Sequence, residues 1–433
     1  MLKSQSRLRL YPLLAIAALV LAACGGSNIE QSVNEDAQPV AEEPQEEAAP
    51  QESEPLEDPT EVSEESSSAV PVNAESLVEN PGEPPRGAES EFATDFTLST
   101  VQFSDILSGG PPKDGIPAVD KPQYISVSEA DEWLDDVEPI AVVEVNGEAR
   151  AFPIQVLMWH EIANAEVGGQ AVSVTFCPLC NTAIAFNREL DGLVMDFGTS
   201  GRLRFSNLIM YDRQTETWWQ QATGEAIVGE QVGKQLEFLP MAMISWLDFK
   251  ENYADSLVLS RDTGHSRNYG SNPYAGYDDI NRSPFLFIGP ETPGELPAMA
   301  RVLTVELGEE TIAYPYSVMA EVGVVNDSVD GTELAVFWQP GVASALDAAT
   351  ISSGEDVGAV EVFSRELNGE TLSFSFENGV IVDEQTGSEW DVLGRAISGE
   401  LAGEQLEKLV GINHFWFSWA AFKPETKVYS PEA

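Results

Sequence analysis

The chain of 433 residues carries 72 Asp and Glu residues but only 22 Lys and Arg residues, so its formal net charge is −50. This excess of negative charge repels polyanions, and we therefore expect no nucleic-acid partner. The hydrophobic content of 43% supports a sizeable core, whereas the three cysteines are too few for a fold built on disulfides.

The first 23 residues predict a signal peptide of the lipoprotein type. A basic head with Lys3, Arg7 and Arg9 precedes an apolar run over residues 11–23 that is too short to cross a bilayer as a helix. The run ends in Leu-Ala-Ala-Cys, the pattern at which such peptides are cleaved and the new N-terminal cysteine, Cys24, is acylated. We therefore expect an exported protein that is anchored through lipid on Cys24 to the periplasmic or cell-surface side of a membrane.

Residues 24–91 predict an acidic, disordered tether. They are rich in Glu, Pro, Ser, Ala and Gln, and Arg86 is their single basic residue. A segment of this composition buries too little apolar surface to fold. We expect it to hold the folded part away from the membrane.

Residues 92–433 predict two diverged copies of one domain. Several residue pairs match without a gap at a separation of 162 positions. These pairs are Glu144/Glu306, Pro153/Pro315, Val156/Val318, Asn164/Asn326, Val167/Val329, Gly169/Gly331 and Pro178/Pro340. We place the first copy at residues 92–260 and the second at residues 300–433, separated by an inserted Gly-, Tyr- and Asn-rich loop at residues 261–299.

The pattern within each copy favours strands. Hairpin-type turns such as Asn146-Gly147 and Asp330-Gly331 separate alternating apolar runs. Helical periodicity is brief and falls at residues 154–165, 241–253 and 414–422. The sequence therefore predicts an α+β fold of mostly antiparallel strands with short helices, in which the two copies are related by a pseudo-twofold axis.

Comparison of the two copies separates residues that the fold needs from residues that it does not. Pro178 is retained as Pro340, which indicates a structural turn. Four neighbouring residues are not retained. Cys177, Cys180, His160 and Glu161 have Gln339, Val342, Val322 and Gly323 at the corresponding places. These four are the strongest functional candidates in the chain.

The motif Cys177-Pro-Leu-Cys180 brings two sulfurs within reach of one point, where they can bind a soft or borderline metal or form a small disulfide. His414, which has Met241 at its place in the first copy, adds a second histidine. If the pseudo-twofold packing unites Cys177, Cys180, His160 and His414, the set suits zinc or copper. The sequence does not establish that they meet.

Further polar residues are candidates for supporting roles. Glu161, Asp212 and Asp262 are candidates for proton transfer or for orienting a metal-bound imidazole, and Arg202, Arg213, Arg261 and Tyr274 are candidates for lining a pocket. Ion pairs and turns account for most of them equally well. The chain contains no phosphate loop, dinucleotide-binding fingerprint, serine nucleophile elbow or paired-histidine zinc-protease motif.

Several longer motifs resemble the domain of unknown function 3179 family. They are Trp-His-Glu-Ile at residues 159–162, Thr-Phe-Cys-Pro-Leu-Cys-Asn-Thr-Ala at 175–183, Met-Tyr-Asp-Arg-Gln-Thr at 210–215, Ser-Arg-Asp-Thr-Gly at 260–264 and His-Phe-Trp-Phe at 414–417. The resemblance covers nearly all of the folded part and implies a group of bacterial and archaeal proteins, many exported, without an established activity. Arg202, Arg204 and His265 depart from the family's usual residues, which implies a different ligand preference if they line a pocket.

These observations leave three functions open and do not decide whether the chain is an enzyme. The first is an extracytoplasmic metal-binding lipoprotein that holds zinc or copper. The second is a thiol oxidoreductase in which Cys177 attacks and Cys180 resolves. The third is a non-catalytic lipoprotein whose Tyr-rich loop binds a small molecule or a protein partner.

Overall fold

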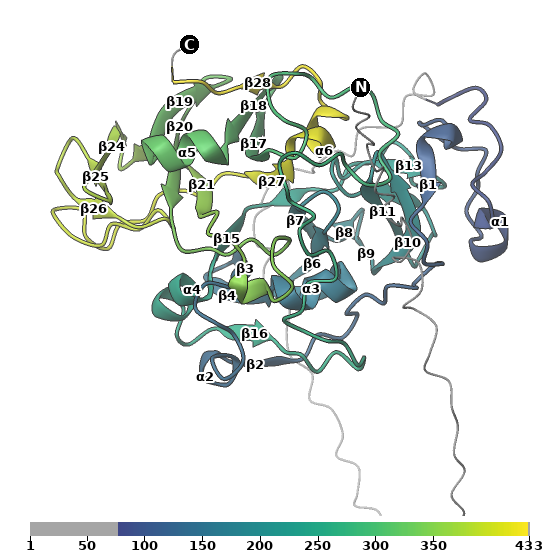
Figure 1. Cartoon of the computed structure of the whole chain (residues 1–433), viewed down its shortest axis with the longest axis horizontal. Helices are drawn as coiled ribbons and strands as arrows, with labels where there is room; N and C mark the ends of the chain where they lie inside the picture. The colour runs from purple at the N-terminus through teal and green to yellow at the C-terminus, as the bar shows by residue number, and fades with distance from the viewer. Residues whose placement is uncertain (1–76, 432–433) are drawn as a thin grey trace, which may run out of the picture. The chain divides into compact units, whose positions relative to one another are not determined.

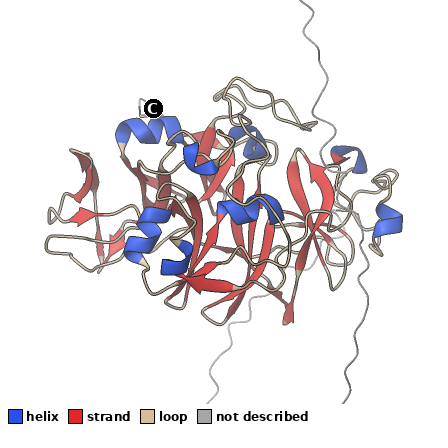
Figure 2. Ribbon diagram, turned by 60° about the horizontal axis from the view of Figure 1, so that its bottom comes forward, coloured by secondary structure: helices blue, strands red, loops and turns tan. Residues whose placement is uncertain are grey.

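The computed structural model of the protein describes residues 77–431. The predicted signal peptide, Cys24 and most of the predicted tether lie outside these residues. The described chain consists mostly of antiparallel strands with a few short helices, which confirms the predicted α+β class (Figures 1 and 2). Among the described residues, no helix is long and apolar enough to cross a membrane.

Two sheets carry most of the long-range pairing. The first has the order β15 (Met241–Ser245), β3 (Pro139–Val145), β4 (Glu148–Pro153), β16 (Leu257–Leu259) and β2 (Tyr124–Ser126). The second has the order β28 (Lys427–Val428), β18 (Glu310–Pro315), β17 (Arg301–Leu307), β27 (Ile412–Phe415), β7 (Thr182–Asn187), β6 (Gln170–Cys177) and β5 (Ile162–Val167), with β14 (Phe238–Leu239) also paired to β7.

The remaining strands form a further five-stranded sheet, two three-stranded sheets and two hairpins. The five-stranded sheet contains β1 (Ile106–Ser108), β10 (Phe197–Arg204), β11 (Asn207–Asp212), β12 (Trp218–Gln220) and β13 (Ala226–Val228). Two three-stranded sheets contain β19 (Val324–Val329), β20 (Thr332–Gln339) and β21 (Ala359–Ser364), and β24 (Phe374–Glu377), β25 (Val380–Asp383) and β26 (Glu389–Trp390). Two hairpins pair β8 (Glu189–Leu190) with β9 (Leu193–Val194) and β22 (Glu366–Leu367) with β23 (Glu370–Thr371).

The helices are all short. They are α1 (Ala88–Glu91), α2 (Val127–Ala130), α3 (Ile154–His160), α4 (Trp246–Asn252), α5 (Tyr316–Val322) and α6 (Trp416–Ala420), with 3-10 turns at Phe103–Asp105 and Ile351–Ser353. Each of the three predicted helical stretches proves to be part strand. Residues 162–165 belong to β5, residues 241–245 to β15, and residues 414–415 to β27, because cross-strand pairing prevails over the local helical periodicity.

The element order of the first half recurs in the second. The succession β3, β4, α3, β5, β6 and β7 has its counterpart in β17, β18, α5, β19, β20 and β21. The last strand of each half also recurs. β16 pairs with β4, and β28 pairs with β18, both in parallel. This agreement supports the predicted duplication, whereas the pseudo-twofold axis itself stays a prediction.

The large sheet joins the two halves. Strand β27, from the second half, pairs with β17 along its length and also meets β7 of the first half at Asn413 and Ala183. A single buried cluster contains Phe176 from the first half and Phe415 and Phe417 from the second. The loop over residues 261–299, all of it described, contains no helix or strand and packs Tyr277 into the same cluster. The halves therefore share one core.

The packed part of the chain begins earlier than the composition predicts. Within the segment assigned to the tether, Val78 donates a backbone hydrogen bond to Ser99 at 2.8 Å, and Ala88 is buried beside Tyr211 and Trp218. Residues 77–91 thus belong to the packed part, because long-range contacts compensate for their low intrinsic hydrophobicity.

An ion pair between Glu91 and Arg202 supplies the first test. The Arg202 side chain is only 3% exposed and pairs with Glu91 at 3.2 Å. Replacing Glu91 with Gln leaves a buried guanidinium without its anion, so we expect urea unfolding to report a loss of roughly 1–2 kcal/mol. Glu89 is exposed in the same helix, and Glu89→Gln is the matched control. Equal effects of the two changes would contradict the packing of residues 77–91.

Candidate functional site

The two predicted cysteines lie in a buried turn between β6 and β7. Cys177 is the last residue of β6, and the backbone N–H of Cys180 donates to its carbonyl at 3.2 Å. Both thiols are free, and the residues are 2% and 0% exposed. The turn therefore presents its sulfurs to the interior of the protein and not to the surface.

Both sulfurs face one backbone carbonyl. The Sγ atoms of Cys180 and Cys177 lie 3.2 Å and 3.8 Å from the carbonyl oxygen of Ser206. Ser206 and Phe205 form the turn between β10 and β11 with φ values of 68° and 52°, in the left-handed region that residues with side chains rarely adopt. The Ser206 hydroxyl holds this turn by donating to Phe285 at 2.6 Å. Strained backbone of this kind concentrates at functional sites.

Segments distant in sequence fix the cysteine turn from outside. The backbone N–H of Phe415, in β27, donates to the carbonyl of Cys180 at 2.8 Å. The Tyr277 hydroxyl, from the inserted loop, donates to the carbonyl of Leu179 at 3.0 Å. The thiol site is thus completed by the second half of the chain and by the loop, neither of which is near it in sequence.

Glu161 adds an acid to the site. It follows α3 with a left-handed φ of 58°, and burial raises the pKa of its carboxyl to about 8. The pKa of Cys177 is raised well above its ordinary value, mainly because the thiol is buried, and then because it lies beside Cys180 and Glu161. Burial, followed by the charges of Glu161 and Cys177, also raises the pKa of Tyr274. At neutral pH the site therefore holds a neutral thiol and a protonated carboxyl.

His160 is engaged on both ring nitrogens. Its Nδ1 lies 2.7 Å from the carbonyl of Pro117, and its Nε2 lies 2.8 Å from the Tyr269 hydroxyl and 3.2 Å from that of Thr263. Burial lowers its pKa to about 4, so the ring is neutral at physiological pH. These partners direct His160 towards the inserted loop.

His414 reaches the cysteine turn without contacting a sulfur. Its Nδ1 lies 2.8 Å from the hydroxyl of Thr182, two residues after Cys180, and its ring packs against Trp419 at 5.0 Å. Burial lowers the pKa of His414 to about 3. Its Nε2 is buried without a hydrogen-bond partner among the described residues.

The predicted set of two sulfurs and two imidazoles is not assembled as a metal site. Within residues 77–431, no group of three or more His, Cys, Asp or Glu side chains is arranged to hold a metal ion. The reason is geometric: His160 is held by Pro117 and Tyr269, and Thr182 occupies Nδ1 of His414. The dithiol and Glu161 are the predicted residues that lie together here.

Most of the remaining predicted residues have partners of their own. Arg213 pairs with Asp114 at 2.8 Å and Asp120 at 3.1 Å, and Arg261 donates to Gln155 at 2.9 Å. Asp262 is exposed. Arg202 likewise pairs with Glu91. Of the predicted pocket residues, Tyr274 is the one whose pKa the charge of Cys177 raises, so it is the one that lies near the cysteine turn.

Asp212, predicted for proton transfer, organises a turn. It accepts hydrogen bonds from the backbone N–H of Thr215 at 2.6 Å and from the indole of Trp219 at 2.9 Å. Asp383 accepts the same bonds from Thr386 at 2.6 Å and Trp390 at 3.0 Å. The second half of the chain has no thiols yet keeps this arrangement at Asp383, and this observation favours a turn-forming role for Asp212 over proton transfer.

Sequence reasoning missed three residues of the site, namely Ser206, Tyr277 and Thr182. The Phe205-Ser206 turn contains none of the Gly, Asn or Asp residues that signal a left-handed turn. Tyr277 lies in the Tyr-rich loop that was singled out, but its hydrogen bond to Leu179 depends on tertiary packing.

The motifs around this site identify the family. The family described as "Protein of unknown function (DUF3179)" matches residues 113–426, which include the cysteine turn, Glu161, the inserted loop and His414. The chain belongs to the DUF3179 family. This confirms the resemblance inferred from the motifs. No curated protein and no solved structure matches the chain.

The buried carboxyl of this DUF3179 protein predicts a particular pH dependence. The pKa of Glu161, about 8 in the folded protein, lies above its ordinary value of 4.5, so folding favours the protonated form. The resulting stabilisation is complete below about pH 4.5 and is lost as the pH rises through 8. Relative to Glu161→Gln, the unmodified protein should therefore lose roughly 3–5 kcal/mol of unfolding free energy between pH 4.5 and 8.5.

Urea unfolding of both proteins at several pH values measures this difference. The pKa values of His160 and His414 are lowered and act in the opposite direction below pH 6.5, but both residues are present in the two proteins and cancel. Parallel stability curves for the two proteins would show that Glu161 is not a buried acid.

Proposed function

We propose that this DUF3179 protein is an extracytoplasmic thiol–disulfide redox protein, in which Cys177 and Cys180 alternate between dithiol and disulfide. The observation that carries the proposal is the shared contact of both sulfurs with the Ser206 carbonyl, 3.2 Å and 3.8 Å away, beside the buried Glu161. The two thiols also lie within hydrogen-bond reach of each other, so a small rotation of their side chains brings the sulfurs to bonding distance.

Glu161 supports the proposal as a proton carrier. Burial raises the pKa of Glu161 to about 8, which narrows the gap between this carboxyl and the Cys177 thiol, whose own pKa burial also raises. An ordinary exposed carboxyl, ionised at neutral pH and far more acidic than a thiol, exchanges protons with it much less favourably. The second copy has Gly323 at this place and no thiols, so the acid and the cysteines occur together.

The reaction is a thiol–disulfide exchange with a disulfide of a partner molecule. The exchange starts from the minor fraction of molecules in which Glu161 is ionised at neutral pH. There the carboxylate takes the proton of Cys177, and the thiolate attacks one partner sulfur, which forms a mixed disulfide and breaks the partner's bond. The released partner sulfur takes the proton back from Glu161. Cys180 then attacks Cys177 and gives its proton to the second departing partner sulfur. Two electrons have passed, leaving one disulfide here and two thiols on the partner.

The surroundings of the pair set the rate of this exchange. Because the thiols are 2% and 0% exposed, a partner disulfide reaches them only when the turn at residues 205–206 or the loop at Tyr277 opens. Cys177 is the attacking residue because it lies beside Glu161. As part of the same proposal, lipid on Cys24 holds the protein outside the cytoplasm, where disulfides persist.

Zinc or copper binding remains the rival proposal for the same thiols. In the described residues it has only the two sulfurs as ligands, whereas protein zinc sites use three or four side chains. A two-thiolate site suits a soft ion such as Cu(I). Both proposals require the cysteines, so the experiment must distinguish disulfide formation from metal binding.

Redox titration of the full chain makes that separation. The protein is equilibrated in glutathione buffers of graded potential, its free thiols are alkylated, and the products are counted by mass spectrometry alongside the metal content. We expect Cys177 and Cys180 to become protected together as one two-electron step, with no stoichiometric metal. Cys24→Ser should leave this step unchanged, whereas Cys177→Ser or Cys180→Ser should abolish it.

Glu161→Gln provides a kinetic test in the same assay. We expect the midpoint potential to change little and the rate of exchange at pH 7 to fall by about 100-fold or more, because the proton carrier is lost. Thiols that stay reduced at every potential would rule the redox function out. Bound metal that Cys177→Ser releases, without any disulfide, would establish the rival proposal instead.

A further inference from the structure

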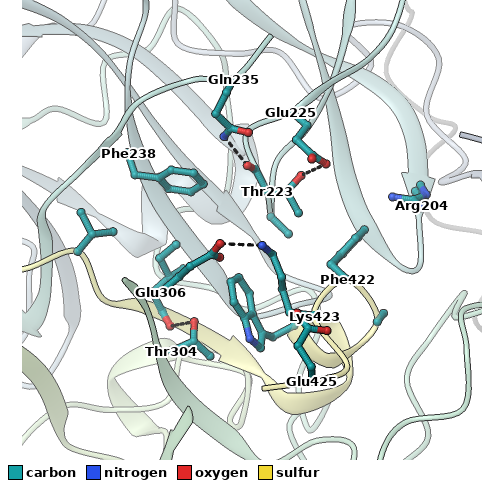
Figure 3. A pocket seen from close by; sticks show the side chains of 15 residues that line it. Arg204, Thr223, Glu225, Gln235, Phe238, Thr304, Glu306, Phe422, Lys423 and Glu425 are labelled. Carbon is teal, nitrogen blue, oxygen red and sulfur yellow. Dashed lines mark hydrogen bonds and ion pairs between the residues drawn. The ribbon is translucent and has the colours of Figure 1, made fainter. Parts of the chain in front are cut away.

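A cavity of about 750 Å³ lies between the two halves of the chain (Figure 3). The first half supplies the end of β10, the turn between β12 and β13, and β14. The second half supplies β17, β27 and the segment after α6. None of the residues that line it belongs to the thiol site, and Arg204 is the one lining residue that the sequence analysis had linked to a pocket.

Arg204 is the unusual group in the wall of this cavity. Its guanidinium lies over the rings of Phe205 at 4.5 Å and Phe422 at 5.3 Å. Its Nε is buried without a hydrogen-bond partner in the described part of the chain. None of the arginine ion pairs within residues 77–431 includes it. Burial correspondingly lowers the pKa of Arg204 from its ordinary value.

Other partly buried arginines show what Arg204 lacks. Arg301 pairs with Asp278 at 2.7 Å, and Arg188 pairs with Asp196 at 2.9 Å. The Arg204 side chain is half-buried, and its buried Nε has no hydrogen-bond partner among the described residues, so part of its desolvation is uncompensated. The stacking on two rings fixes the Arg204 guanidinium in place and leaves its fork of donors for a ligand at the cavity.

Carboxylates in the same wall define the rest of the ligand. The charge of Glu306 is neutralised by Lys423 at 2.7 Å, whereas the exposed Glu225 has, among the described residues, only the hydroxyl of Thr223 as a side-chain hydrogen-bond partner, at 3.0 Å. Glu225 interacts electrostatically with Arg204, yet the two do not form an ion pair. Figure 3 shows both on the same side of the cavity, with the ring of Phe238 across from them. The cavity therefore offers a cation and an anion held apart, next to an apolar surface.

From this arrangement we propose that the cavity binds a small zwitterion, an α-amino acid with an apolar or aromatic side chain. Its carboxylate pairs with Arg204, its ammonium group pairs with Glu225, and its side chain packs on the aromatic wall that includes Phe238 and Trp419. A carboxylate alone would meet uncompensated repulsion from Glu225, and an amine alone would leave Arg204 unpaired. The site does not depend on the redox chemistry of the thiols.

Calorimetric titration of the full chain tests the ligand class with four probes. They are L-phenylalanine, 3-phenylpropionate, which lacks the ammonium group, phenethylamine, which lacks the carboxylate, and inorganic phosphate. We expect L-phenylalanine to bind about tenfold or more tightly than either analogue, because each lost charge removes one charge-assisted hydrogen bond. Phosphate should not compete. Equal binding of 3-phenylpropionate or of phosphate, or no binding of L-phenylalanine, would overturn the proposal.

Three variants locate the site. Arg204→Gln should weaken L-phenylalanine about tenfold or more without weakening phenethylamine, which has no carboxylate. Glu225→Gln should weaken L-phenylalanine by a similar factor without weakening 3-phenylpropionate, which has no ammonium group. Arg395, stacked on Tyr253 at 4.3 Å and outside this cavity, provides the matched control. Arg395→Gln should bind like the unmodified protein. Affinity that survives Arg204→Gln in a protein with an unchanged circular dichroism spectrum would place the ligand elsewhere.

Discussion

The structure depends on one short strand, β27, that pairs with strands of both halves of the chain. β27 pairs with β17 of its own half and meets β7 of the other, so it covers an edge that each half would otherwise expose. The same four residues carry His414, which bonds Thr182, and Phe415, whose backbone N–H holds Cys180. Removing this contact would open the core and release the cysteine turn together. The thiol site is therefore a property of the joined halves and of neither one alone.

Features that arise from local chemistry were predictable. Asn146 and Asp330 adopt left-handed φ values of 51° and 46° before their glycines, as their hairpin motifs require. The absence of the cysteines, His160 and Glu161 from the second copy was also predictable, because a comparison of the chain with itself is enough to detect it. That comparison selected Cys177 and Glu161 separately, and the structure places them close enough for Glu161 to influence the pKa of the Cys177 thiol.

Features that arise from tertiary contacts were not predictable. Residues 241–245 carry helical periodicity but form β15, because β3 offers a pairing edge and Ser245 caps the helix that starts at Trp246. His160 and His414 were both correctly recognised as absent from the other copy, yet their hydrogen-bond partners direct them to different places. Arg204 was noted only as a departure from the family, since no pattern in sequence reveals that it lacks an anion.

Charge connects the two sites that the structure suggests. With a formal net charge of −50, the protein creates a negative potential that opposes ionisation of any buried acid or thiol and repels anionic reactants. A redox pair kept neutral by burial is insensitive to that potential in its resting state, and a proton carrier such as Glu161 lets the charge form only during exchange. A zwitterion likewise enters such a field without net electrostatic cost. The resting thiol pair and the proposed zwitterionic ligand thus share one property, because each has no net charge in the negative potential of this protein.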